Sequence, residues 1–173
     1  MMIMLCHGFQ ACSLDMEMLK REMGRALPAA LIISSTANEG DTNAEITLMG
    51  KRLADEVVKM VDRHFEQKER AIISFVGHSM GGIIARASLP FLQDYHSQLG
   101  FYFSLSTPHL GYLNGVDTMI KAGLWFMRTV NKVPSLDQLS MEDADHPRDT
   151  FLYRLSQVGH LRNFQKVILL SSS

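Results

Sequence analysis

The sequence has 173 residues, of which 46% are hydrophobic and 20% are charged. These values are typical of one folded domain and argue against a disordered chain or a bundle of membrane-spanning helices. The formal net charge is −1, and lysines and arginines are spread along the chain, which disfavours nucleic acid as a partner.

The N-terminus and the two cysteines bear on where the protein works. Residues 1–5 are apolar but shorter than the hydrophobic part of a secretory signal, so we interpret them as the start of a strand. No apolar run approaches the ~20 residues that span a bilayer. Cys6 and Cys12 lack metal-ligand spacing and are too few for a disulfide framework. We therefore expect an intracellular protein without a transmembrane segment.

Strand-like and helix-like patterns alternate along the chain, which predicts the α/β class. We expect a doubly wound, mostly parallel sheet of about five strands with the third one central. Short apolar runs predict strands at Ile3–Cys6, Ala30–Ser34, Ala71–Val76, Phe101–Leu105 and Val167–Leu170. Helical patterns predict helices at Asp15–Arg25, Asn43–Phe65, Gly82–Tyr95, Val116–Val130 and Thr150–Ser156.

The third predicted strand is followed by Gly77-His78-Ser79-Met80-Gly81-Gly82 and an apolar helical stretch. This is the G-x-S-x-G pattern of a nucleophile elbow, a sharp strand-to-helix turn that exposes the serine hydroxyl. Glycines two residues before and after the serine let strand and helix pass without a collision of Cβ atoms. The plainer interpretation is a glycine-rich turn with an incidental serine. Because strand and helix both stand where an elbow needs them, we predict that Ser79 is a nucleophile.

A second glycine-bearing segment, His7-Gly8-Phe9-Gln10, directly follows the first predicted strand. Hydrolases with a nucleophile elbow place an oxyanion-binding loop at this position. We predict that the backbone N–H groups of Met80 and Phe9 hold the developing oxyanion. His78 adjoins the serine but leaves the turn in another direction, so we predict a packing or supporting role for it and for His7.

Four segments resemble the lipase-like serine esterases of the α/β-hydrolase superfamily, whose relatives include inositol deacylases of lipid anchors. The resemblance extends over nearly the whole chain. The later segments also resemble the branch found as the C-terminal domain of large eukaryotic proteins. The four segments are residues 5–9 (LCHGF), 77–82 (GHSMGG), 104–111 (SLSTPHLG) and 149–156 (DTFLYRLS), and residues 123–127 (GLWFM) support the branch.

The resemblance implies a triad in the chain order serine, acid, histidine, with the acid in the loop after the strand that matches Val167–Leu170. The triad acid and base are then expected beyond Ser173. The family sheet also begins with strands that precede the His-Gly strand. We therefore expect residues 1–173 to form a partial domain, an α/β-hydrolase core truncated at both ends.

Histidines and aspartates within the chain are weaker candidates for the base and the acid, because none stands in the context of a triad residue. His109 belongs to the family motif Thr-Pro-His-Leu-Gly, where a structural role in the floor of the site is favoured. The candidates are His109, His146 and His160 for the base and Asp143, Asp145 and Asp149 for the acid.

The segment between Gly111 and Asp149 departs from plain alternation and holds an aromatic-rich helical stretch around Trp125 and Phe126. An acyl-binding cap is its functional interpretation, and a buried core helix is the structural alternative. Attachment to a membrane surface is disfavoured, since few cations lie on the polar face.

Two functions from different classes remain open. The first is a serine hydrolase that acts through Ser79 on carboxylic esters, lipid esters among them, and needs no metal or cofactor. The second is a noncatalytic pseudoenzyme or interaction subunit that keeps the hydrolase core, with a protein partner covering the truncated sheet. The elbow and the oxyanion loop favour the first function, and the missing acid and base favour the second.

Overall fold

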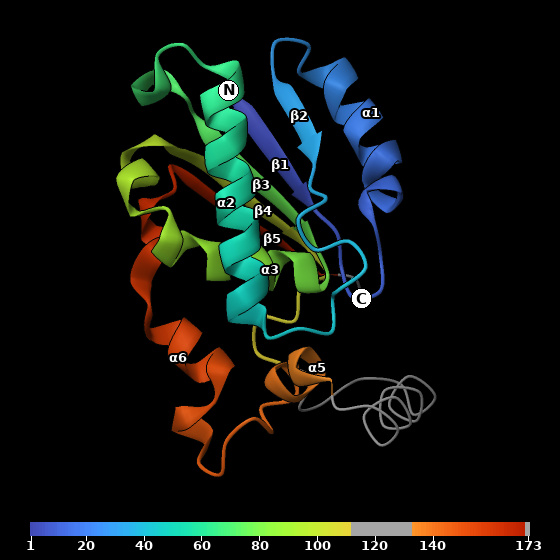
Figure 1. The fold of residues 1–173 in the computed structure, drawn as a ribbon, viewed down its shortest axis with the longest axis vertical. Helices are drawn as coiled ribbons and strands as arrows, with labels where there is room; N and C mark the ends of the chain where they lie inside the picture. The colour runs from blue at the N-terminus through green and yellow to red at the C-terminus, as the bar shows by residue number, and fades with distance from the viewer. Residues whose placement is uncertain (112–132, 172–173) are drawn as a thin grey trace.

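The computed structural model describes residues 1–111 and 133–171, which form a five-stranded parallel sheet with helices on both faces (Figure 1). The strand order is β2-β1-β3-β4-β5, which confirms the predicted parallel sheet and its central third strand. The strands are β1 (Met2–Cys6), β2 (Leu31–Ser34), β3 (Ile73–His78), β4 (Leu99–Leu105) and β5 (Lys166–Leu170).

Helices fill the connections between the strands, because a chain must cross the sheet to start a second parallel strand. In Figure 1, α2 crosses in front of the sheet, α1 lies beside β2, and α6 lies at the lower left. The α-helices are α1 (Glu17–Ala26), α2 (Ile46–His64), α3 (Met80–Ser88), α5 (Pro134–Leu139) and α6 (Phe151–Gln157). The 3₁₀ helices are η1 (Ser13–Met16), η2 (Lys68–Arg70), η3 (Leu89–Phe91), η4 (Gln93–Gln98), η5 (Pro147–Asp149) and η6 (Gly159–Asn163). None of the helices that the structure describes has the length and apolar character of a membrane span.

The two faces of the sheet pack into two hydrophobic cores. Alternate residues of β1 point to opposite faces, as in any strand. Met2 and Met4 belong to the larger core, which includes the buried residues of α2 and α3, whereas Ile3 and Leu5 pack with Met16 on the α1 side. Because both faces of β1 are buried, its sequence reads as a continuous apolar run.

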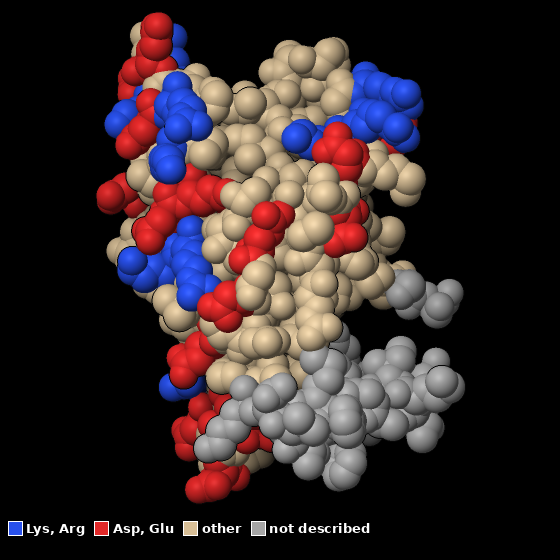
Figure 2. Space-filling model, turned by 45° about the vertical axis from the view of Figure 1, so that its right-hand side comes forward, with Lys and Arg blue, Asp and Glu red and all other residues tan. Residues whose placement is uncertain are grey.

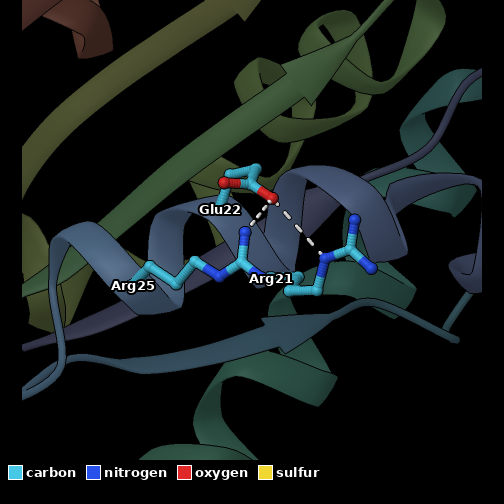
Figure 3. Close-up of polar contacts among 3 residues, drawn as sticks. All are labelled: Arg21, Glu22 and Arg25. Atoms are coloured by element: carbon cyan, nitrogen blue, oxygen red, sulfur yellow. Dashed lines mark hydrogen bonds and ion pairs between the residues drawn. The ribbon is translucent and has the colours of Figure 1, made fainter.

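The outward face of α1 carries charged groups that contribute little to stability. One carboxylate oxygen of Glu22 lies 2.7 Å from Arg25 Nη1 and 3.5 Å from Arg21 Nε (Figure 3). All three side chains are exposed, and exposed ion pairs are worth about 0–1 kcal/mol. On the face drawn in Figure 2, acidic and basic groups are interspersed along the left-hand side. The inward residues Leu19 and Met23, which pack against the smaller core, therefore hold α1 on the sheet.

The predicted helix Gly82–Tyr95 was wrong at both ends. The helix α3 begins two residues earlier, at Met80, and ends at Ser88, after which the chain continues in η3 and η4. Pro90 explains the early end, because proline has no N–H with which to continue the ladder of α-helical hydrogen bonds. The predicted helix Val116–Val130 lies outside the described residues.

The strand β5 differs from the other strands in its exposure. Val167, Leu169 and Leu170 are 41%, 57% and 56% exposed, whereas the side chains of β1 are all buried. The strand pairs with β4 alone and stands at the end of the described sheet. Its apolar side chains are consequently open to solvent in the described part of the chain.

The inward orientation of Ile73, the first residue of β3, can be tested by the same substitution at Ile73 and at Ile72, which precedes the strand. Ile73 is fully buried, whereas Ile72 is 40% exposed. Ile73→Val should lower the free energy of unfolding by about 0.5–1.5 kcal/mol, since it removes a buried methyl group. Ile72→Val should change it by less than about 0.5 kcal/mol. Urea unfolding of both variants measures the difference, and equal losses would contradict the inward orientation of Ile73.

Candidate active site

Ser79 occupies the turn between β3 and α3, at the carboxyl edge of the sheet. Its backbone has φ 53° and ψ −128°, a conformation that a residue with a Cβ adopts only where its surroundings enforce it. The Ser79 N–H donates to the Leu105 carbonyl over 2.8 Å, which ties the turn to the end of β4. Although Ser79 stands at the N-cap of α3, its side chain makes no capping hydrogen bond. The hydroxyl is therefore not used in holding the helix.

The glycines around Ser79 allow backbone to approach backbone. A Cβ placed on Gly77 would lie 2.3 Å from Gly82 Cα, and one placed on Gly81 would lie 2.1 Å from the Cys6 carbonyl oxygen. Both contacts are with main-chain atoms, which cannot move aside as the end of a flexible side chain can. The first turn of α3 thus begins directly against the ends of β1 and β3, with no side chain between them.

The loop after β1 passes beside the serine. A Cβ on Gly8 would lie 3.1 Å from Ser79 Cβ and 3.5 Å from Ser79 Oγ. The next residues are anchored by a hydrogen bond of 2.9 Å from the Gln10 N–H to Thr42 Oγ1. Within the described residues the Phe9 amide has no hydrogen-bond acceptor. Met80 is the first residue of α3, where an N–H has no partner inside the helix. The two predicted oxyanion donors are thus N–H groups at the same edge of the sheet.

His109 lies in the loop after β4, and both of its ring nitrogens are engaged. Nδ1 lies 3.1 Å from Arg86 Nη1, and Nε2 lies 2.9 Å from Ser104 Oγ. Arginine can only donate, so Nδ1 accepts, and the proton of the neutral ring is on Nε2, which donates to Ser104. Burial, together with the Arg86 charge, lowers the pKa of His109 to about 4. This histidine is held neutral as part of the framework.

The other predicted acids and bases bond to groups other than Ser79, stand before β5, or are exposed. His146 is exposed and its Nδ1 accepts from the Arg148 N–H over 3.2 Å. The ring of His160 in η6 lies 4.9 Å from that of His96, before β5 and hence towards the amino edge of the sheet. Asp143 accepts from the Phe151 N–H at the start of α6 over 2.7 Å, and Asp145 and Asp149 are exposed. Within residues 1–111 and 133–171, no side chain is hydrogen-bonded to Ser79 Oγ.

The two histidines next to the predicted site residues differ in burial. His7 is 3% exposed, and its Nδ1 lies 3.1 Å from the Gly8 carbonyl oxygen. It is placed to support the loop that carries Phe9. His78 is exposed, which does not fit the packing role considered for it.

Sequence reasoning did not single out Arg86 and Ser104, the two partners of His109. Arg86 is the only charged residue of α3, a helix that is otherwise apolar or small. A lone cation in a helix that must pack on a sheet is a signal of a buried polar contact. Its partner is 23 residues away in the sequence, so the pairing itself is visible only in the fold.

Two glycine-to-alanine substitutions should change stability in opposite directions. Gly81→Ala places a Cβ against the Cys6 carbonyl, so we expect a loss of about 1–3 kcal/mol or more in the free energy of unfolding. Gly24→Ala lies within α1 with nothing within 4 Å of the new Cβ, and should stabilise by about 0.5–1 kcal/mol. Denaturant unfolding of both variants is the measurement. A neutral Gly81→Ala would contradict the close approach of α3 to β1.

The neutral state of His109 predicts a pH dependence of stability. Its folded pKa of about 4 lies below the ordinary value of 6.5, so the unfolded chain binds the extra proton first as pH falls. The stability that comes from keeping His109 neutral is fully present above about pH 6.5, and it is lost progressively as the pH falls from about 6.5 to 4. Arg86 and the ring of Tyr102 are the charged and titratable groups that face His109.

Replacement by glutamine removes the titration while keeping a donor and an acceptor. The stability of His109→Gln relative to the parent chain should therefore improve as pH is lowered through this window. Unfolding curves at pH 4.5 and 7.5 measure the change. A constant difference at the two pH values would contradict the assignment.

Comparison with known proteins identifies the family of this chain. The family model described as "Putative serine esterase (DUF676)" matches residues 1–173. Among solved structures, a lipase from Bacillus licheniformis in its mature form superposes with a TM-score of 0.59 at 15% identity, over 95% of this chain and 62% of that one. A phospholipase from Legionella pneumophila gives 0.60 at 13% identity, over 98% of this chain and 38% of that one.

A carboxyl esterase from a metagenome gives a TM-score of 0.61 at 13% identity, over the whole of this chain and 50% of that one. The chain thus spans between 38% and 62% of the length of these three proteins. Likeness at such low identity concerns the fold, whereas the family match covers every residue. The chain has the α/β-hydrolase fold and belongs to the serine esterase family that the model describes.

Proposed function

We propose that this chain carries the nucleophile and the oxyanion hole of a serine esterase that hydrolyses carboxylic esters. The observation that carries the proposal is the conformation of Ser79, which has a positive φ on a turn between β3 and α3 and a hydroxyl that caps no helix. A strained backbone that presents an unused nucleophile beside a glycine loop is the arrangement that acyl transfer needs.

In the proposed reaction, Ser79 Oγ attacks the ester carbonyl carbon while a base removes the hydroxyl proton. The carbonyl oxygen becomes an oxyanion, which the N–H groups of Phe9 and Met80 stabilise. Collapse of the intermediate breaks the bond to the alcohol, which leaves with a proton, and water then releases the acid from the acyl-enzyme. The described residues offer no base to Ser79, so the proposal takes its acid and base from residues outside 1–111 and 133–171. Each step balances without a metal or an organic cofactor.

Lipid esters are the substrate class that we propose within the carboxylic esters. Two of the solved structures with this fold are named as a lipase and a phospholipase, which supports the choice by analogy only. Most of the segment predicted as an acyl-binding cap, residues 112–132, lies outside the described residues. The branch of C-terminal domains in large eukaryotic proteins and an intracellular location also stay predictions.

The alternative proposal is a noncatalytic interaction subunit. The observation that favours it is the apolar surface of β5, where Val167, Leu169 and Leu170 are each more than 40% exposed. Such a surface is typical of one that a further segment or a partner covers. In that case Ser79 would be a remnant of the fold and would not react.

A serine-directed probe distinguishes the two proposals. We expect a fluorophosphonate to label the chain slowly and to fail with Ser79→Ala, while Ser156→Ala, an exposed serine outside the site, labels like the parent. Turnover of a p-nitrophenyl ester should be weak, since loss of the triad partners leaves only about 10³–10⁴-fold of acceleration over water.

Two outcomes would contradict these expectations in different ways. Equal labelling of the parent chain and Ser79→Ala would reject the esterase proposal in favour of the interaction subunit. Robust turnover that Ser79→Ala abolishes would instead show that the described residues, or residues 112–132, contain a working base.

A further inference from the structure

Arg86 is a half-buried cation whose contacts link three separate segments of the fold. It lies on α3, seven residues after Ser79, which is the N-cap of this helix. Nη1 contacts His109 Nδ1 in the loop after β4 at 3.1 Å, and Nη2 donates to the Leu155 carbonyl of α6 over 3.3 Å. The guanidinium therefore joins α3, the loop after β4, and α6.

Arg86 has no acidic partner among the described residues. The side chain is half-buried, and burial lowers its pKa from the ordinary value. Within the described residues no carboxylate forms an ion pair with it. A charge that is partly removed from water and has only neutral partners is costly, and an apolar side chain would pack there more easily. What arginine supplies is a planar fork of donors with fixed directions.

The loop that Arg86 holds, and the end of β4 before it, also touch the elbow. The carbonyl of Leu105, the last residue of β4, accepts from the Ser79 N–H over 2.8 Å. A Cβ on Gly82 would lie 2.2 Å from Thr107 Oγ1, so this loop packs against the first turn of α3. From β4, the Tyr102 hydroxyl donates to the Gly82 carbonyl over 2.9 Å. These contacts hold the first turn of α3. The contact of Arg86 with His109 links the helix to the same loop about two turns after Ser79.

Contacts at two points along a helix fix its rotation as well as its position. Packing against α2 and the sheet already buries most of α3, and the Arg86 contact adds a directional link near the end of the helix. The fixed proton on His109 Nε2 makes the second contact directional, because Arg86 donates to the ring and the ring donates to Ser104.

We propose that Arg86 is a positioning residue: through neutral His109 it fixes α3 against the end of β4 and so sets the geometry of Ser79 and the Met80 amide. The structural half of this proposal concerns the elbow alone, and only its consequence for reaction rate rests on the proposed function. Arg86 itself touches no reacting atom.

The test uses the full 173-residue chain, four variants around the contact, and Ser79→Ala as the reference for labelling. Arg86→Met removes the guanidinium and keeps the length of the side chain, and His109→Phe removes the two ring nitrogens from the other side of the contact. His109→Gln keeps one acceptor and one donor. Arg154→Met, an exposed arginine of α6 without an ion-pair partner in the described chain, is the matched control. The measurements are amide hydrogen exchange over residues 79–82, ¹⁵N shifts of the His109 ring, and the rate of fluorophosphonate labelling.

Arg86→Met and His109→Phe should each speed exchange over residues 79–82 by about 10-fold or more, as expected for the loss of a charge-assisted hydrogen bond. In Arg86→Met the His109 ring should lose its single tautomer and titrate at higher pH. Labelling should slow by about 10- to 100-fold, since small displacements of a nucleophile have effects of this size. His109→Gln should stay within about 3-fold of the parent chain, and Arg154→Met should match it.

Exchange over residues 79–82 that is unchanged in His109→Phe and in any folded Arg86→Met would overturn the proposal. If Arg86→Met does not fold, His109→Phe and its rescue by His109→Gln decide alone. A parent chain that is labelled no faster than Ser79→Ala would reject the proposed esterase function while leaving the exchange measurement to decide on positioning. Normal labelling of Arg86→Met together with faster exchange would overturn the claimed effect on Ser79.

Discussion

Direct contact between main-chain atoms at the start of α3 is the constraint on which the site depends. Gly77 and Gly81 leave no room for side chains, so α3 rests on the backbone of β1 and β3. Only a sharp turn can join a strand to a helix packed this closely, and the turn places Ser79 at a positive φ with its hydroxyl above the sheet edge. The same closeness brings the Gly8 loop within reach of the serine. The close packing of α3 on β1 and β3 therefore positions both the predicted nucleophile and the predicted oxyanion loop.

Around the elbow, the pKa values of Arg86 and His109 are shifted mainly by burial, and no ion pair is described there. The described salt bridges are on the surface, whereas the polar groups beneath α3 are held by neutral partners such as His109 and Tyr102. A neutral histidine is well suited to this place, because it offers one acceptor and one donor without adding a second charge beside Arg86.

The parallel direction of the strands and the central place of the third one could be predicted from the sequence, because each buried strand is a short apolar run bounded by turn residues. The elbow was equally visible, since its glycines and serine are adjacent in sequence and stand between strand and helix. The contact of Arg86 with His109 could not be predicted, because it joins residues 23 positions apart through the packing of a helix on a loop. The end of α3 was missed because periodicity outweighed the local effect of Pro90. The exposure of β5 was also beyond prediction, since an apolar run does not tell whether anything covers it.

The close packing under the elbow also separates the two cysteines chemically. Cys6 is 3% exposed at the end of β1, and burial, with the nearby Glu56 charge, raises the pKa of its thiol far above the usual range. Cys12 is half-buried and lies just after the Gly8–Gln10 loop. A thiolate-directed reagent therefore meets an inert thiol at one position and an accessible one at the other. Maleimide dyes attached to Cys12 would give a single fluorescent reporter beside the oxyanion loop, installed in the natural sequence without any engineered residue.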